Sequence, residues 1–311
     1  MTAPRFAFID IGTNTILCLI AELRDGGRFR VLNDLAEIAR LGEGVDATGA
    51  INPQAEQRSA QVLRGYLETC EALGVAEIVA VGTSALRDAR NGGAVLERWR
   101  AQLGLNVRLI SGAEEAGYSF LAVQKGLSVD AQELLVADIG GGSTELIRGN
   151  RLGISGALSV DIGTVRLTER FIRSDPVSVV DFNVMVAAID SELERLRQRW
   201  PQVTAASAWV GIAGTFTTLA AVELQLARYS HSAVHGRQLT QSEVQRQIRL
   251  FQSKTVAERK TITGLEPKRA DVILAGACLI DSMMRLYGRG QVLVSDEGVR
   301  YGLLYERLGR M

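Results

Sequence analysis

The sequence predicts an α/β protein built from two similar halves, because a glycine-rich turn between apolar runs occurs twice. The first turn, Asp10-Ile-Gly-Thr-Asn-Thr15, follows the apolar run Phe6–Ile9 and precedes a second one. The second turn, Asp138-Ile-Gly-Gly-Gly-Ser-Thr144, follows Leu134–Ala137 and also precedes an apolar run. Two apolar runs joined by such a turn are typical of a β-hairpin.

A second pair of segments repeats in the same order. The apolar runs Ile78–Val81 and Trp209–Ala213 each lead into Gly-Thr at the start of a helical pattern. Asp10 to Gly82 spans 72 positions (82 − 10), and Asp138 to Gly214 spans 76 (214 − 138). Two motifs that recur in order at nearly equal spacing predict two α/β copies.

Capping signals place the helices between these landmarks. Asn52 followed by Pro53 predicts a helix start, and apolar residues then recur at helical spacing up to Gly74. Ser111 and Glu114 have the spacing of a capping box, which opens a helix to Gly126. Further helices are expected at 184–199, 240–252, 269–287 and 302–308, with a strand at 291–294.

The repeat also predicts the domain limits. We expect an N-terminal domain at 1–126 and a C-terminal domain at 127–299, with the final helix, about 300–311, packing back on the first domain. A chain of 311 residues is long enough for two cores.

Composition excludes several classes of protein. The 35 basic and 35 acidic residues balance, which argues against sequence-independent binding to nucleic acid. Three well-separated cysteines and two histidines argue against a disulfide framework or a His-rich zinc site. The sequence has neither a signal-peptide pattern nor a run of about 20 apolar residues, so we expect a cytoplasmic protein without a membrane partner.

The glycine-rich turns are candidate phosphate sites. Without Cβ atoms, successive backbone N–H groups can converge on an anion, and Ser143 adds a hydroxyl donor. The competing interpretation is a tight hairpin in which the aspartate caps its own turn. That interpretation suits the first turn better than the second, which has three consecutive glycines.

The two turns differ in one charge. Glu145 lies seven positions after Asp138, whereas Leu17 occupies the matching position after Asp10. Only the second hairpin therefore carries carboxylates on both arms, an arrangement that suits Mg²⁺. This asymmetry favours a single active site between the halves.

The segments Gly82-Thr-Ser84 and Gly214-Thr215 are expected at helix starts, where unpaired N–H groups favour phosphate. Arg87 follows within the first helical turn and could clamp a phosphate. The alternative is that the hydroxyl residues are simply N-caps.

Glu114 and Glu115 need separate interpretations. The capping box gives Glu114 a structural task. Glu115 has no such local partner in the sequence; it is either a solvated surface carboxylate or a base that accepts a proton from an attacking water.

In all these motifs the chain resembles the exopolyphosphatase and guanosine pentaphosphate phosphatase family of the actin-like ATPase superfamily. The matching segments are Phe8–Thr15, Gly82–Arg87, Ile110–Ala116, Asp138–Glu145, Gly163–Glu169, Gly211–Thr215, Val234–Gly236 and Val294–Asp296. The resemblance covers essentially the whole chain. It implies two actin-like (ribonuclease H-like) domains with a cleft between them.

The resemblance also implies roles for individual residues. Glu115 would be the catalytic base, and Asp138 and Glu145 would hold Mg²⁺ and the attacking water. The residues implied in phosphate binding are Thr13, Asn14, Ser84, Arg87, Gly140, Gly141, Gly142, Ser143, Thr144, Gly214 and Thr215.

The expected activity is release of terminal phosphate from inorganic polyphosphate. Hydrolysis of guanosine pentaphosphate at its 5′ end, phosphate transfer by an ATP-using kinase or ATPase of the same fold, and non-catalytic binding of polyphosphate or an alarmone remain alternatives. The oligomeric state, including a homodimer, stays open.

Overall fold

The computed structural model describes residues 3–24, 26–129, 131–202 and 208–310. The described chain forms two compact units: unit 1 combines residues 1–122 with 299–311, and unit 2 comprises 123–298. The chain therefore first passes between units at 122/123, four positions before the predicted limit at Gly126. The cleft predicted between the halves stays a prediction.

Unit 1 is built on a five-stranded sheet in the order β3-β2-β1-β4-β5. Its strands are β1 (Arg5–Ile11), β2 (Thr15–Arg24), β3 (Arg28–Ile38), β4 (Glu77–Gly82) and β5 (Val107–Leu109). The hairpin β1–β2 and the strand β3 are antiparallel, whereas β1, β4 and β5 run parallel. The carboxyl ends of the three parallel strands therefore share one edge of the sheet.

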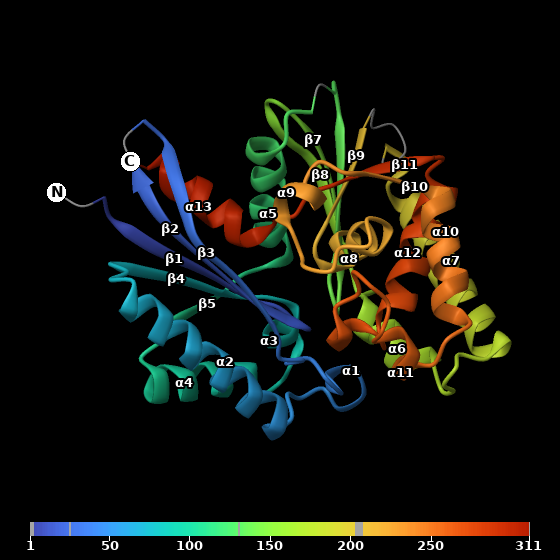
Figure 1. The fold of residues 1–311 in the computed structure, drawn as a ribbon, viewed down its shortest axis with the longest axis horizontal. Coiled ribbons are helices and arrows are strands. Elements are labelled where there is room, and N and C mark those ends of the chain that lie inside the picture. Colours follow the sequence, from blue (N-terminus) through green and yellow to red (C-terminus); the bar gives the residue numbers. More distant parts are fainter. Residues whose placement is uncertain (1–2, 25, 130, 203–207, 311) are drawn as a thin grey trace. The chain divides into compact units, whose positions relative to one another are not determined.

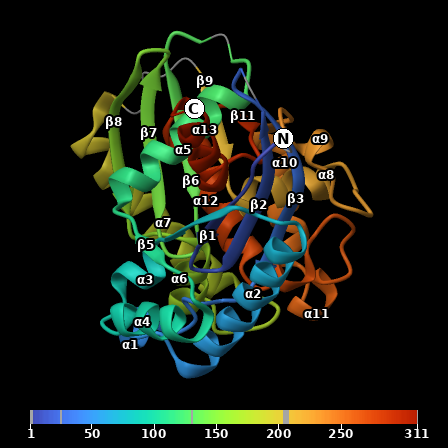
Figure 2. The same ribbon diagram turned by 90° about the vertical axis from the view of Figure 1, so that its left-hand side faces the viewer.

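Helices cover both faces of this sheet. They are α1 (Val45–Thr48), α2 (Pro53–Ala72), α3 (Ser84–Asp88), α4 (Gly92–Leu103), α5 (Gly112–Gly126) and α13 (Val299–Gly309). Figures 1 and 2 both show the strands between α13 on one side and α2 and α4 on the other. One apolar cluster includes Leu63 of α2 and Trp99 of α4, and a second, on the other face, includes Leu304 of α13.

The helix α13 packs tightly against α5. A Cβ atom at Gly302 of α13 would collide with the carbonyl oxygen of Tyr118 in α5, so the two backbones touch there. Arg300 also donates two hydrogen bonds to Asp34 of β3, at 2.8 and 3.0 Å. These contacts hold α5, and with it Glu115, in place within unit 1.

Unit 2 is built on a six-stranded sheet in the order β10-β11-β9-β6-β7-β8. Its strands are β6 (Leu134–Ile139), β7 (Thr144–Asn150), β8 (Gly153–Val160), β9 (Ala208–Ile212), β10 (Gln238–Thr240) and β11 (Gln291–Val294). The strands β6, β9 and β11 run parallel, and the hairpin β6–β7 and the strand β8 are antiparallel.

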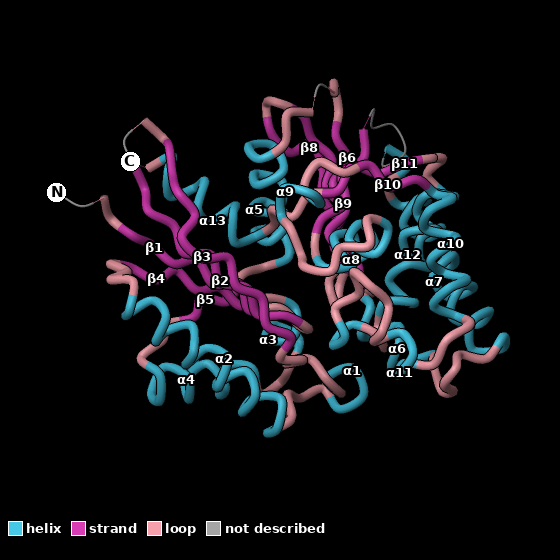
Figure 3. The backbone as a smooth tube through the Cα atoms, in the orientation of Figure 1, coloured by secondary structure: helices cyan, strands magenta, loops and turns pink. Residues whose placement is uncertain are grey.

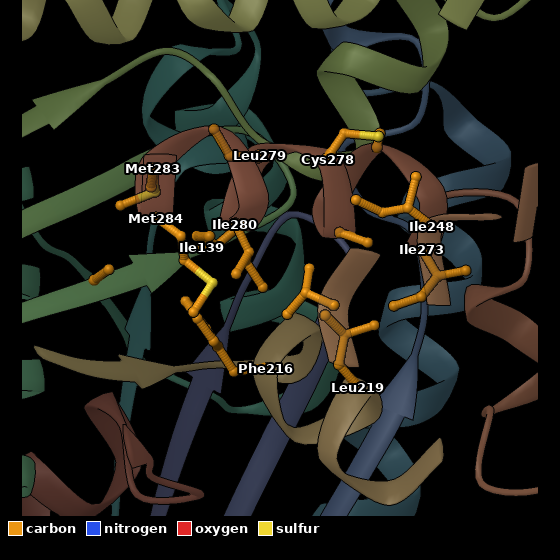
Figure 4. Packing of buried hydrophobic residues seen from close by; sticks show 14 of the residues in the cluster. Ile139, Phe216, Leu219, Ile248, Ile273, Cys278, Leu279, Ile280, Met283 and Met284 are labelled. Carbon is orange, nitrogen blue, oxygen red and sulfur yellow. The ribbon is translucent and has the colours of Figure 1, made fainter. Parts of the chain in front are cut away.

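The helical elements of unit 2 are α6 (Thr164–Phe171), α7 (Val179–Arg199), α8 (Gly214–Glu223), α9 (His231–Val234), α10 (Gln241–Gln252), α11 (Val256–Arg259), the 3₁₀ turn η2 (Pro267–Arg269) and α12 (Ile273–Leu286). Figure 3 shows α7, α10 and α12 together on one side of the strands. The central helix α12 is buried almost all round, and its residues Leu279 and Met283 pack in one large apolar cluster with Phe216 of α8 (Figure 4).

The two sheets repeat one topology, which confirms the predicted α/β fold with two similar halves. The order β3-β2-β1-β4-β5 of unit 1 corresponds to β8-β7-β6-β9-β11 of unit 2, with β10 added at the edge. Each predicted hairpin is present, as β1–β2 and β6–β7.

The predicted helices are present with shifted ends. The helix expected at 184–199 begins at Val179 because Ser178 accepts a hydrogen bond from Asp181 as its N-cap. The helix expected at 269–287 begins only at Ile273, after the separate turn η2. Among the described residues, no helix combines the length and apolar character that a membrane span requires.

Candidate functional site

The glycine-rich turn of unit 2 lies between β6 and β7 and is closed by a hydrogen bond from the Gly140 N–H to the Ser143 carbonyl, at 3.0 Å. The first turn of α6 donates hydrogen bonds to the carbonyl oxygens of this turn. The N–H of Thr164 donates to the Gly140 carbonyl at 3.0 Å, and the N–H of Val165 donates to the Gly141 carbonyl at 2.9 Å. The carbonyl groups of the turn therefore face α6.

Arg166 completes this arrangement, since its Nε donates to the Gly142 carbonyl at 2.9 Å. In a trans peptide the N–H points opposite to the preceding carbonyl. The N–H groups of Gly141, Gly142 and Ser143 consequently point away from α6. Three successive amides directed to one side form a concavity that suits phosphate oxygens.

Close packing of α6 requires a glycine. A Cβ atom at Gly163, the residue before α6, would collide with the Gly141 carbonyl. Thr144 supports the same packing, because its fully buried hydroxyl donates to the Ile162 carbonyl at 2.6 Å. The Thr144 side chain is thus engaged in anchoring the segment before α6.

The two carboxylates of this hairpin face each other. The register of β6 and β7 places Asp138 directly opposite Glu145. Both residues are buried, and Glu145 also accepts a hydrogen bond from Ser159 Oγ at 2.7 Å. Opposed like charges destabilise a strand pair, so this donor set suits a hard divalent cation. In unit 1 the register pairs Asp10 with Leu17, as the sequence predicts.

The second turn of unit 2 joins β9 to α8. Ala213 precedes α8 with φ 72°, a strained conformation for a residue other than glycine, and makes no side-chain cap. The N–H groups of Gly214 and Thr215 therefore begin the helix without a capping side chain, as a phosphate-binding helix start would.

Arg269 is a site residue that the sequence did not single out. A Cβ atom at Gly214 would collide with the Arg269 guanidinium, which therefore lies directly against the turn. Burial lowers the pKa of Arg269, while the nearby Glu266 opposes this effect. Arg269 lies 55 positions after Gly214 in the sequence (269 − 214). Their proximity is therefore visible only in the tertiary structure.

In unit 1 the first glycine-rich turn is held by the segment after β3. The N–H of Gly42 donates to the Thr13 carbonyl at 2.8 Å, and the N–H of Arg40 donates to the Asn14 carbonyl at 3.0 Å. The Nδ2 atom of Asn14 is buried and has no hydrogen-bond partner among the described residues. An unsatisfied buried donor at this turn is suited to an anionic ligand.

Ser84 and Arg87 both lie in the short helix α3 at the end of β4. Thr83, its N-cap, makes no side-chain cap, and Ser84 Oγ donates to Asp88 at 3.1 Å. Arg87 donates through Nη1 to the Ile110 carbonyl and to Glu115 Oε2, each at 3.1 Å. The structure thus joins Arg87 to Glu115, a contact that sequence spacing did not reveal.

The two glutamates at the start of α5 have separate environments. Glu114 and Ser111 form the predicted capping box, with hydrogen bonds of 2.9 and 3.2 Å between backbone and side chains. The backbone N–H of Ser111 and then its hydroxyl hold the pKa of Glu114 below its usual value. Glu115 is 8% exposed and paired with Arg87, so it is not a solvated surface residue.

In unit 1, Thr13–Asn14, Ser84 and Glu115 follow β1, β4 and β5; in unit 2, Gly140–Ser143 and Gly214 follow β6 and β9. Each group therefore lies at the carboxyl-end edge of its own sheet, where open α/β sheets bind ligands.

The sequence profile of the Ppx/GppA phosphatase family matches residues 19–311. Among curated proteins, the chain is similar to Exopolyphosphatase 2 of Mycobacterium tuberculosis strain H37Rv. The two are 33% identical over 99% of this chain and 100% of the relative.

A second relative is the guanosine-5′-triphosphate,3′-diphosphate pyrophosphatase of Vibrio atlanticus, at 28% identity over 98% of this chain and 60% of the relative. Among solved structures, the Aquifex aeolicus member of the Ppx/GppA family is 32% identical. It superimposes with a TM-score of 0.81 over 99% of this chain and 98% of that structure.

Proposed function

Because the chain belongs to the Ppx/GppA phosphatase family, we propose that it is an exopolyphosphatase that releases terminal orthophosphate from inorganic polyphosphate. The observation that carries this proposal is the hydrogen-bonding of the Gly140–Ser143 turn. The carbonyl groups of Gly140, Gly141 and Gly142 are bound by α6, so the three amides that follow them point to the opposite side, where they would bind a phosphate. Such preorganised donors stabilise charge on a transferring phosphoryl group.

The proposed metal is Mg²⁺. Phosphatases of this family depend in general on a divalent cation. Asp138 and Glu145 would hold it, because two opposed and buried carboxylates match a hard cation. When bound, the cation would neutralise negative charge on the phosphate oxygens.

Glu115 is the proposed base. Its carboxylate would orient a water molecule and accept its proton during attack on the terminal phosphorus atom. The hydrogen bond from Arg87 fixes the direction of this carboxylate. Ser143, Asn14 and the turn at Gly214–Thr215, with Arg269 against it, would bind further phosphate oxygens.

Hydrolysis of guanosine pentaphosphate at its 5′ end is the second candidate function. It is motivated by the name of the Vibrio atlanticus relative. The chemistry at the terminal phosphate is the same, so the candidates differ only in what binds the remainder of the substrate.

A phosphate-release assay separates these functions. The purified chain with Mg²⁺ is expected to release orthophosphate progressively from long polyphosphate, and affinity is expected to rise with chain length as more cationic contacts engage. Added salt should weaken binding, since it screens these contacts. ATP with a range of acceptors serves as the control for a kinase activity.

Faster release from guanosine pentaphosphate than from polyphosphate at equal concentration would favour the second candidate. Polyphosphate binding without release from either substrate would contradict both.

The two glutamates provide a test of the base. Glu115→Gln should lower kcat by about a hundred- to ten-thousandfold, because it removes the proton acceptor, and should leave polyphosphate binding intact. Glu114→Gln is the matched control: glutamine also serves in a capping box, so kcat should change little. An inactive Glu114→Gln beside an active Glu115→Gln would reverse the assignment.

The metal site is tested by Asp138→Asn. The loss of one carboxylate should raise the Mg²⁺ concentration needed for half-maximal activity, or abolish turnover. Asp161→Asn makes the same change at an exposed position of unit 2 and should leave the Mg²⁺ requirement unchanged. An Asp138→Asn variant with the original Mg²⁺ dependence would count against the site.

A further inference from the structure

We propose that His231, His235 and Glu297 form a second cation site, one for a divalent transition metal, separate from the Mg²⁺ site proposed at Asp138 and Glu145. One ligand atom from each of the three residues lies within 4.8 Å of the others. All three belong to unit 2. His231 and His235 are the only histidines in the sequence, and the Glu297 carboxylate beside them is buried.

Local backbone structure brings the two imidazoles together. His231 begins α9 and His235 follows four positions later, so both side chains emerge on one side of the turn. Their rings are stacked, with centroids 5.0 Å apart and planes inclined by 14°. The N–H of Gly236 donates to the Val294 carbonyl at 2.8 Å, which fixes His235 beside the loop after β11.

His231 has the outer partner that a metal ligand needs. Its Nδ1 lies 3.0 Å from Asp296 Oδ2. With the proton of Nδ1 donated to this carboxylate, Nε2 is the ring atom that would bind a metal. Carboxylates bonded to metal-binding histidines in this way orient the ring and raise its basicity.

His235 has an outer partner of a second kind. Its Nε2 lies 3.2 Å from the Gly126 carbonyl and can only donate to it, so Nδ1 carries the lone pair. Nδ1 accepts a hydrogen bond from the Asp296 N–H at 3.3 Å, which is long for this type of bond. A cation would replace that weak bond and keep the bond to Gly126.

Glu297 supplies the third ligand. The residue is 7% exposed, and its carboxylate lies directly against Gly126, where any Cβ atom would collide with it. Two imidazoles and one carboxylate are the ligands of Zn²⁺ and its neighbours, whereas Mg²⁺ and Ca²⁺ prefer oxygen alone. Zinc–ligand bonds of about 2.0–2.2 Å in a tetrahedron place donor atoms about 3.3–3.6 Å apart. The two rings must therefore leave their stacked arrangement when the ion binds, so that both lone pairs converge on it. Asp296 must move with His231 to keep their hydrogen bond.

The proposed site has a consequence for the fold. The chain passes between units at 122/123 and 298/299, and Gly126 and Glu297 lie just inside unit 2 from these two points. A cation here would fix the segment of Glu297 to the segment 231–235, and His235 would keep its hydrogen bond to Gly126. Three protein ligands also leave one tetrahedral position for water or an anionic oxygen.

A competition titration of Zn²⁺ against a chromophoric chelator tests the site in the full chain without a histidine tag. We expect one Zn²⁺ per chain, and a thermal midpoint that rises with Zn²⁺ because the ion binds the folded state. With only two histidines, both imidazole ¹⁵N resonances should shift at one equivalent of Zn²⁺ and stay in place with Mg²⁺.

Matched variants locate the site. Asp296→Asn should weaken Zn²⁺ binding by about 10- to 100-fold, as the loss of an outer-shell partner does, and His231→Gln should weaken it more. Gly126→Ala should weaken it by displacing Glu297, whereas Asp138→Asn should leave it unchanged. The midpoint without Zn²⁺ verifies that each variant folds.

Equal Zn²⁺ affinity of His231→Gln and the original chain would overturn the proposal, as would imidazole resonances that do not respond. Because the readout is binding, the result does not depend on the exopolyphosphatase activity.

Discussion

The arrangement of the glycine-rich turn in unit 2 depends on one set of hydrogen bonds, those from the first turn of α6 to the carbonyl groups of Gly140–Gly142. They satisfy the acceptors of the turn and thereby fix the direction of its amides. The N–H groups of Thr164, Val165 and Arg166 donate to the turn, so in the proposed function α6 would position the turn and leave phosphate binding to the amides of the turn itself. Gly163 is required because α6 and the turn touch backbone to backbone.

The two units repeat one strand order, and their hairpins differ in the number of carboxylates that they carry. The repeated strand order gives each unit a hairpin turn and a strand-to-helix turn at the same sheet edge. In unit 2 the hairpin pairs Asp138 with Glu145; in unit 1 it pairs Asp10 with Leu17. Unit 1 instead contributes Glu115, which follows β5 and is held by Arg87.

Capping residues and glycine-rich turns in the sequence predicted the helix starts and the hairpins, because these features depend on residues close together in the chain. Asn52 caps α2, Ser111 and Glu114 form their capping box, and both hairpins occur where the glycine-rich turns lie. Contacts between distant segments left no local pattern. The Arg269 guanidinium lies against Gly214 although the two residues are far apart in the sequence, and no local pattern predicts such a contact. The cluster around His235 likewise joins three segments, so the histidine count alone argued against a metal site there.

The most direct test of the central claim is a titration of the ¹⁵N-labelled chain with tripolyphosphate in the presence of Mg²⁺, followed by amide chemical shifts. The amide resonances of Gly141, Gly142 and Ser143 should shift first and saturate together, since hydrogen bonds to phosphate deshield them. The amides of Thr164 and Val165, already bonded to the turn, should shift far less. Saturable binding that leaves the Gly141–Ser143 amides in place would contradict the account.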